Sequence, residues 1–176
     1  MRYIDIPIGP LAPEVFNMVV EIPRNSANKY EYDPELNLFR LDRTLYSPMH
    51  YPGDYGFVPG TFAGDGDPLD VLVLVSNPSF TGCVLEVRPL GMLAMSDQGY
   101  EDLKVLCVPT RDPRSDTLSD YKDVLPHTLR EIERFFSIYK ELEGKATVMG
   151  GWKSAAEAKE AVIVASNRYK ESAPKS

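Results

Sequence analysis

Three aspartates fall within the motif Asp65-Gly66-Asp67-Pro68-Leu69-Asp70, immediately before the uncharged run Val71–Val75. β-Branched residues occupy every second place of that run, which is typical of a buried strand. Two carboxylates about 5 Å apart at an effective dielectric near 20 repel by roughly 3 kcal/mol, so crowded acids acquire raised pKa values unless a positive charge lies among them. Hard divalent cations prefer such oxygen ligands, and we expect Mg²⁺ here. The motif is not an EF-hand, because its third acid falls at position 6 and Ser76 stands where that loop requires glutamate.

A second group of acids, Asp97–Asp102, occupies the hairpin end between two predicted strands, 84–95 and 104–108. Adjacent strands of a barrel can bring this hairpin end beside Asp65–Asp70, where it would form the second wall of a site for several metal ions. Taken alone, the same group also fits an ordinary polar turn.

Cationic side chains that could hold a phosphate occur in the first half of the chain. In the predicted strand 38–45, Arg43 shares an apolar face with Phe39 and Leu41. It therefore either snorkels at a rim or reaches into a functional cavity. Three further charged residues surround the predicted turn 23–28 and fit either a surface cluster or the same cavity: Glu21, Lys29 and Glu31.

Near the C-terminus, Tyr139 is in phase with the apolar stripe of a predicted helix, which is also consistent with plain core packing. Lys140 lies at the edge of that stripe. Only two histidines occur, His50 and His127, and their separation argues against a histidine-based zinc site.

Composition indicates a single domain over residues 1–176, with 43% hydrophobic residues to form its core. The net charge of −7 argues against nucleic-acid and anionic-lipid partners. No apolar run approaches the ~20 residues of a membrane helix, and the N-terminus lacks the apolar segment of a signal peptide. We therefore expect a cytoplasmic protein, with Cys83 and Cys107 as buried thiols rather than a disulfide.

Short strands separated by turns are expected between residues 15 and 108, after an irregular proline-containing arm at 1–14. This pattern is typical of a barrel or sandwich. The expected strands are 17–22, 30–32, 38–45, 71–75, 84–95 and 104–108, and the expected turns include 51–56 and 63–66.

Two helices are expected after the polar loop 109–124. The first begins near Pro126, and its apolar face comprises Leu125, Leu129, Ile132, Phe136 and Tyr139. The second begins at Ser154, which forms a capping box with Glu157, and we expect a frayed tail at 171–176. The predicted class is α+β, mainly β, with a barrel-like body closed by two C-terminal helices.

The chain resembles the family I soluble inorganic pyrophosphatases of the bacterial type. The aspartate motif at 65–70 fits the family signature at every position. The resemblance covers roughly residues 15–165 and includes Glu21-Ile22-Pro23, Asn28-Lys29-Tyr30-Glu31, Leu41-Asp42-Arg43, Tyr51-Pro52, Asp54-Tyr55-Gly56, Arg88-Pro89-Leu90-Gly91, Asp97, Asp102, Lys104, Phe135-Phe136, Tyr139-Lys140 and Glu143.

The resemblance implies a role for each matching position. The implied metal ligands are Asp65, Asp70, Asp97 and Asp102, and the implied general base is Asp67. The implied substrate-binding residues are Lys29, Arg43, Tyr55, Lys104, Tyr139 and Lys140, with Glu21 and Glu31 as outer acids of the cavity.

The resemblance also implies a five-stranded OB-like β-barrel with helices outside, several Mg²⁺ ions per active site with Mn²⁺ or Zn²⁺ as alternatives, and a homohexamer. One departure concerns the second acidic group. The family usually has Ala-Gly between the acids at 97 and 102, whereas this chain reads Gln98-Gly99-Tyr100-Glu101.

We therefore expect hydrolysis of pyrophosphate to two orthophosphates, by in-line attack of a metal-activated water that Asp67 deprotonates. Three alternatives stay open: a noncatalytic metal-stabilised barrel that binds anions or a protein, a nucleic-acid-binding OB barrel, and a hydrolase of nucleotide or polyphosphate anhydrides. The acidic charge disfavours the nucleic-acid reading.

Overall fold

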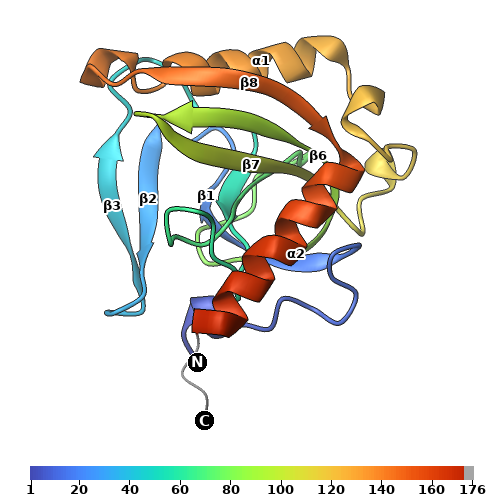
Figure 1. The fold of residues 1–176 in the computed structure, drawn as a ribbon. Helices are drawn as coiled ribbons and strands as arrows, with labels where there is room; N and C mark the ends of the chain where they lie inside the picture. Colours follow the sequence, from blue (N-terminus) through green and yellow to red (C-terminus); the bar gives the residue numbers. More distant parts are fainter. Residues whose placement is uncertain (173–176) are drawn as a thin grey trace.

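The computed structural model describes residues 1–172 and contains a closed ring of strands (Figure 1). The strands pair in the order β1 (Phe16–Ile22), β4 (Asp54–Phe57), β5 (Asp70–Val73), β7 (Tyr100–Pro109) and β6 (Val84–Asp97), and β6 pairs back with β1. All these pairings are antiparallel except β5–β7, which is parallel. The mainly β prediction with an OB-like barrel of five strands is confirmed.

The remaining elements pack around this ring. β2 (Asn28–Asp33) and β3 (Leu38–Thr44) form a separate hairpin that stands beside it, and β8 (Thr147–Ser154) pairs with the outer edge of β6 (Figure 1). α1 (Pro126–Ile138) lies along β8, and α2 (Ala155–Ser172) crosses in front of β6. Short 3-10 turns occur at Tyr3–Asp5, Pro113–Ser115, Tyr121–Asp123 and Glu141–Glu143. Neither α-helix within residues 1–172 combines the length and apolarity needed to cross a bilayer.

β5 is buried on both faces, which explains its uninterrupted apolar sequence. Leu72 packs in a cluster that includes residues of α1, whereas Val71 and Val73 pack in a second cluster that includes residues of α2. The strand that carries Asp70 is therefore fixed between the two helices.

The predicted capping box at the start of α2 is confirmed. The Ser154 backbone N–H donates to Glu157 Oε2 at 2.8 Å, and the Glu157 N–H donates to Ser154 Oγ at 3.3 Å. The expected polar loop at 109–124 also contains caps, because Asp112 and Asp120 accept backbone hydrogen bonds at its two 3-10 turns. Its acids therefore organise the loop locally.

Two strands were missing from the sequence prediction. β4 overlaps the segment 51–56 that was expected to be a turn, and all four of its residues are buried. β8 contains Gly150 and Gly151, so its sequence lacks the continuous apolar alternation that predicts a strand. Pairing with β6 stabilises β8 as a strand, although its own sequence does not predict one.

Two further predictions were wrong in detail. Leu125 does not join the apolar face of α1, because it is the N-cap residue and is 73% exposed. The expected frayed tail begins too early, since α2 continues to Ser172. The rest of that tail, 173–176, lies outside the described residues.

Candidate active site

A cavity of about 490 Å³ brings the predicted site residues together at one end of the ring. Its lining includes Glu21, Lys29, Glu31, Tyr55, Asp65, Asp67, Asp70, Asp97, Asp102, Lys104, Tyr139 and Lys140. Arg43 is the one member of the predicted set that is not part of this lining. The acids of the 65–70 loop and of the 97–102 hairpin thus face the same space, as the sequence analysis expects.

Strand pairing explains why these two acidic segments meet. The parallel register of β5 and β7 aligns Asp70 with Lys104. Asp102 stands two residues before Lys104 on β7, so both side chains project from the same face. At the end of the hairpin, Gln98 and Gly99 adopt positive φ values of 51° and 88°, which reverses the chain directly after Asp97.

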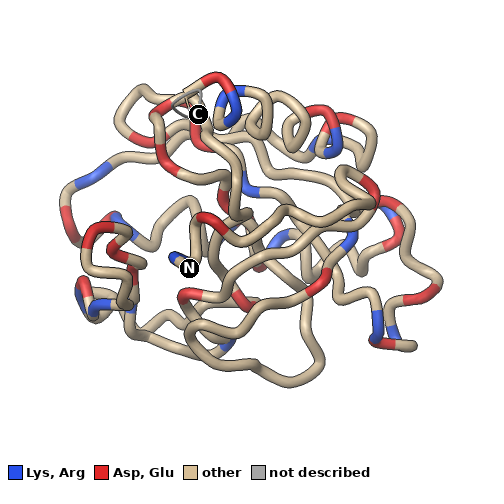
Figure 2. Tube along the Cα trace, turned by 90° about the horizontal axis from the view of Figure 1, so that it is seen from below, with Lys and Arg blue, Asp and Glu red and all other residues tan. Residues whose placement is uncertain are grey.

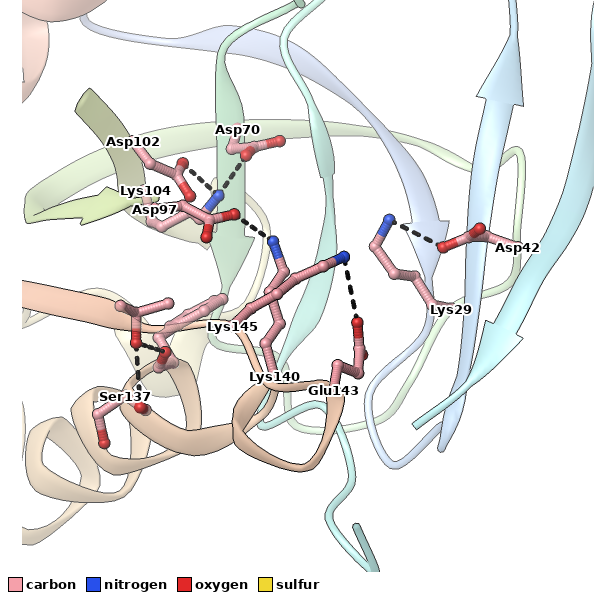
Figure 3. Close-up of polar contacts among 12 residues, drawn as sticks. Lys29, Asp42, Asp70, Asp97, Asp102, Lys104, Ser137, Lys140, Glu143 and Lys145 are labelled. Carbon is pink, nitrogen blue, oxygen red and sulfur yellow. Dashed lines mark hydrogen bonds and ion pairs between the residues drawn. The ribbon is translucent and has the colours of Figure 1, made fainter. Parts of the chain in front are cut away.

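Lys104 is the most deeply buried charge of the site. Its side chain is 4% exposed, and its ammonium group pairs with Asp70 and donates to Asp102 Oδ1 at 2.5 Å (Figure 3). Burial alone would lower the pKa of Lys104, but the two carboxylates raise it above its usual value. Burial also raises the pKa of Asp102, and the charge of Asp70 adds to this rise. Lys104 therefore remains charged and links β5 to β7.

Lys140 makes the corresponding pair with Asp97. Its Nζ donates to Asp97 Oδ2 at 2.5 Å, and the other carboxylate oxygen, Oδ1, is buried without a hydrogen-bond partner among the described residues (Figure 3). Lys140 follows Tyr139, which is 5% exposed and stacks on Phe135 at 5.3 Å between ring centroids. Tyr139 therefore belongs to the core and also lines the cavity.

The 65–70 loop holds its first two acids at an exposed tip. Asp65 Oδ1 accepts a hydrogen bond from the Asp67 backbone N–H at 3.0 Å, and Gly66 between them has a φ of 91°. Partial burial in the cavity raises the pKa of Asp67, and the charges of Asp65 and Asp70 add to the rise. A carboxylate with a raised pKa is better matched to accepting a proton near neutral pH.

The opposite wall comes from β1 and the β2–β3 hairpin. A register shift between Val20 and Ile22 interrupts the pairing of β1 with β4 at Glu21. Glu21 Oε1 accepts a hydrogen bond from the Tyr32 N–H at 2.8 Å. Burial raises the pKa of Glu21 to about 8, although the Tyr32 bond opposes this shift. Glu21 is thus a second titratable acid of the cavity.

Lys29 and Arg43 are neighbours across β2 and β3, and each is paired with acids. Lys29 pairs with Glu31 and lies 3.5 Å from Asp42. Arg43 pairs with Asp42, and its Nε donates to Glu143 Oε1 at 2.8 Å. Arg43 therefore connects β3 to the 3-10 turn that follows Lys140.

Asp42 and Glu143 are ion-pair partners that sequence reasoning did not assign. Both stood in the segments that carry the family resemblance, but neither lies in a pattern that predicts a function. Lys145 also approaches Glu143, at 3.4 Å (Figure 3). Their positions next to cationic groups become apparent only when β3 and residues 141–143 are placed together.

The donor set fits a hard divalent cation. The acids supply only carboxylate oxygens, and the buried Asp97 Oδ1 lacks a partner within the described chain. Within residues 1–172, no three His, Cys, Asp or Glu side chains already converge on one point as a metal site. The ammonium groups of Lys104 and Lys140 instead pair with Asp70, Asp102 and Asp97.

A barrel-end cavity with carboxylates on one side and lysines among them suits a polyanion that arrives with divalent cations. The fold and the site thus define the class of metal-dependent enzymes that transfer or hydrolyse phosphoryl groups.

Comparison with known proteins agrees with this class. The family model described as inorganic pyrophosphatase matches residues 18–170. The inorganic pyrophosphatase of Halalkalibacterium halodurans is 49% identical over 160 residues, covering 91% of this chain and 98% of that protein. The crystal structure of the Thermus thermophilus inorganic pyrophosphatase superposes with a TM-score of 0.94 at 46% identity, covering 97% of this chain and 99% of that one.

A more distant structure is a complex with a ligand. The truncated vacuolar soluble pyrophosphatase of Trypanosoma cruzi, in complex with PPi, has a TM-score of 0.79 at 26% identity, covering 94% of this chain and 73% of that one. The chain belongs to the inorganic pyrophosphatase family, whose members are metal-dependent hydrolases of pyrophosphate.

Proposed function

We propose that the cavity hydrolyses inorganic pyrophosphate to two orthophosphates by in-line attack of water on one phosphorus. The observation that carries this proposal is the meeting of the 65–70 and 97–102 acids with Lys29, Lys104 and Lys140 in one cavity of about 490 Å³. Pyrophosphate has no apolar surface, so its binding depends on charge-assisted contacts of this kind. Family membership supports the same reaction.

The residues that would hold the cations are Asp65, Asp70, Asp97 and Asp102. We assign Mg²⁺, with several ions per site and with Mn²⁺ or Zn²⁺ as alternatives, because all four offer only hard oxygen ligands. Bound cations of this type lower the pKa of water and neutralise charge on phosphoryl oxygens.

Asp67 accepts the proton of the attacking water. Its carboxylate lies in the cavity but does not form an ion pair with a described lysine or arginine, unlike Asp70, Asp97 and Asp102. Its raised pKa brings it nearer to the operating pH, as an effective general base requires.

The cationic and phenolic groups bind and stabilise phosphate oxygens. Lys29 approaches from the β2–β3 hairpin, whereas Tyr139 and Lys140 approach from the end of α1. Arg43, which lies outside the lining residues and is held by Glu143, completes this set. Donors in fixed positions stabilise the charge that develops on the leaving phosphate. Tyr55 and Lys104 also line the cavity and belong to the substrate-binding set, and Glu21 and Glu31 are its outer acids.

Membership of the family also supports proposals on domain organisation, assembly and location. We propose that residues 1–176 form one catalytic domain, that it assembles as a homohexamer, and that it acts in the cytoplasm without nucleic-acid or membrane partners. The net charge of −7 supports the absence of a polyanionic partner larger than the substrate.

Phosphate release from purified protein tests the reaction. We expect orthophosphate from pyrophosphate in Mg²⁺, none after chelation with EDTA, and little from ATP under either condition. Replacing Mg²⁺ by Mn²⁺ or Zn²⁺ tests the choice of cation. Phosphate release that survives chelation, or equal cleavage of ATP, would contradict the proposal.

A further inference from the structure

Lys104 already provides a positive charge inside the acidic wall. Its ammonium group contacts carboxylates from two different strands, Asp70 on β5 and Asp102 on β7. It is 4% exposed, whereas the other cavity lysines, Lys29 and Lys140, are 16% and 14% exposed. Lys104 is therefore already paired with carboxylates of the protein before any ligand binds.

The surroundings of Lys104 restrict its movement. The residue lies within β7, opposite Asp70 in the parallel register, rather than at the end of an element. Its Nζ lies 5.5 Å from the ring centre of Tyr55 and 5.8 Å from that of Phe136. Aromatic faces attract a cation and are too apolar to compete with the carboxylates for it. The ammonium is thus held between rings on one side and acids on the other.

We propose that Lys104 is an internal counterion, which holds Asp70 and Asp102 together before a divalent cation arrives and thereby limits the affinity of the site for that cation. The inference rests on the proposed cation binding. It gives Lys104 a role in setting the affinity for the cation, in addition to its place in the substrate-binding set. Without the ammonium, two partly buried carboxylates would face each other uncompensated, which destabilises a fold strongly. With it, an entering cation shares the same carboxylates with a positive neighbour.

The charge-removing substitution Lys104→Met tests this role, with Mg²⁺ alone as the ligand. Isothermal titration should show Mg²⁺ binding roughly tenfold tighter than in the wild type, because a repulsive charge has been removed. The thermal midpoint in EDTA should fall, and saturating Mg²⁺ should restore most of the loss, since the cation replaces the missing charge.

Lys145→Met is the matched control. Lys145 also pairs with an acid, Glu143, but is 41% exposed and does not line the cavity. Its substitution should leave the Mg²⁺ affinity and both thermal midpoints unchanged. A neutral but polar variant, Lys104→Gln, should behave like Lys104→Met, which separates the loss of charge from the loss of hydrogen bonding.

Unchanged or weaker Mg²⁺ binding in both Lys104 variants would overturn the proposal. Failure of both to fold in saturating Mg²⁺ would overturn it as well, because the cation could then not substitute for the ammonium. Folding only in Mg²⁺ would support it. Pyrophosphate hydrolysis by the wild-type protein is measured separately, so a failure of the proposed reaction would be distinguishable from a failure of this inference.

Discussion

Asp67 differs from the lysine-paired acids of the cavity in what surrounds it. Asp70 and Asp102 pair with Lys104, and Asp97 pairs with Lys140, so these carboxylates are oriented by ammonium groups. Asp67 has acidic neighbours instead, which add to the effect of burial in raising its pKa. A general base that works near neutral pH needs a raised proton affinity of this kind.

The substitution Asp67→Asn should therefore lower kcat by about 10²-fold or more while the protein stays folded and still binds Mg²⁺. The amide keeps the shape of the side chain but cannot take the proton. Steady-state phosphate release measures the rate, and calorimetric titration measures the binding of Mg²⁺. Asp116→Asn, on the exposed 109–124 loop, serves as the control. Turnover near the wild-type value would argue against Asp67 as the base.

Glu21 should make the free energy of unfolding of the metal-free protein depend on pH. Burial raises its pKa in the fold to about 8, above the ordinary value of 4.5, so between these values the folded chain holds a proton that the unfolded chain has lost. Stability contributed by this proton is fully present below about pH 4.5 and is lost as the pH rises through about 8.

In EDTA, the free energy of unfolding should therefore decrease between pH 5 and pH 8, by at most about 1.4 kcal/mol per pH unit from this group. Glu21→Gln should flatten that decrease, because the amide still accepts the Tyr32 hydrogen bond but does not titrate. Urea unfolding across this range measures both proteins. If the free energy of unfolding decreased equally with pH in the wild type and in Glu21→Gln, a group other than Glu21 would be responsible.

Among the elements, β1 and β4 approach each other closely at Gly56. A Cβ atom at Gly56 would lie 1.9 Å from the Val19 carbonyl oxygen and 2.9 Å from the Glu21 nitrogen. The residue therefore allows the backbone of β4 to approach β1 directly beside the irregularity that positions Glu21. A short strand that the sequence analysis mistook for a turn thus fixes one wall of the cavity.

Gly56→Ala should destabilise the protein by about 3 kcal/mol, because backbone atoms rather than flexible side chains must move. Gly64→Ala is the matched control, since a Cβ there would meet nothing within 4 Å. Chemical denaturation in EDTA compares the two variants. Equal midpoints for both would contradict the role assigned to the close approach of the strands.

The sequence predicts elements well where the local pattern is strong. The run that follows Asp70 predicts β5, and Ser154 with Glu157 predicts the start of α2, because each signal lies within a few adjacent residues. β4 and β8 could not be found in this way, since their order comes from pairing with β1, β5 and β6. Partners such as Glu143, 100 positions from Arg43, likewise have no local signal.

At the scale of the whole molecule, closure of the ring turns separate acidic loops into one site. Figure 2 shows acidic segments spread over many loops and strand ends, with basic segments among them. The β5–β7 pairing and the 97–102 hairpin bring five aspartates around one cavity, and Lys29 and Lys140 reach it from β2 and from the end of α1. These five aspartates contribute to the net charge of −7.

We propose above all that carboxylates of the 65–70 loop and the 97–102 hairpin bind the same divalent cations. Crystals of the protein soaked in Mn²⁺ test it most directly, through anomalous difference maps. We expect peaks in the cavity that carboxylate oxygens from both segments contact, Asp70 and Asp102 among them. Peaks held by one segment alone, or an absence of peaks in this cavity, would contradict it.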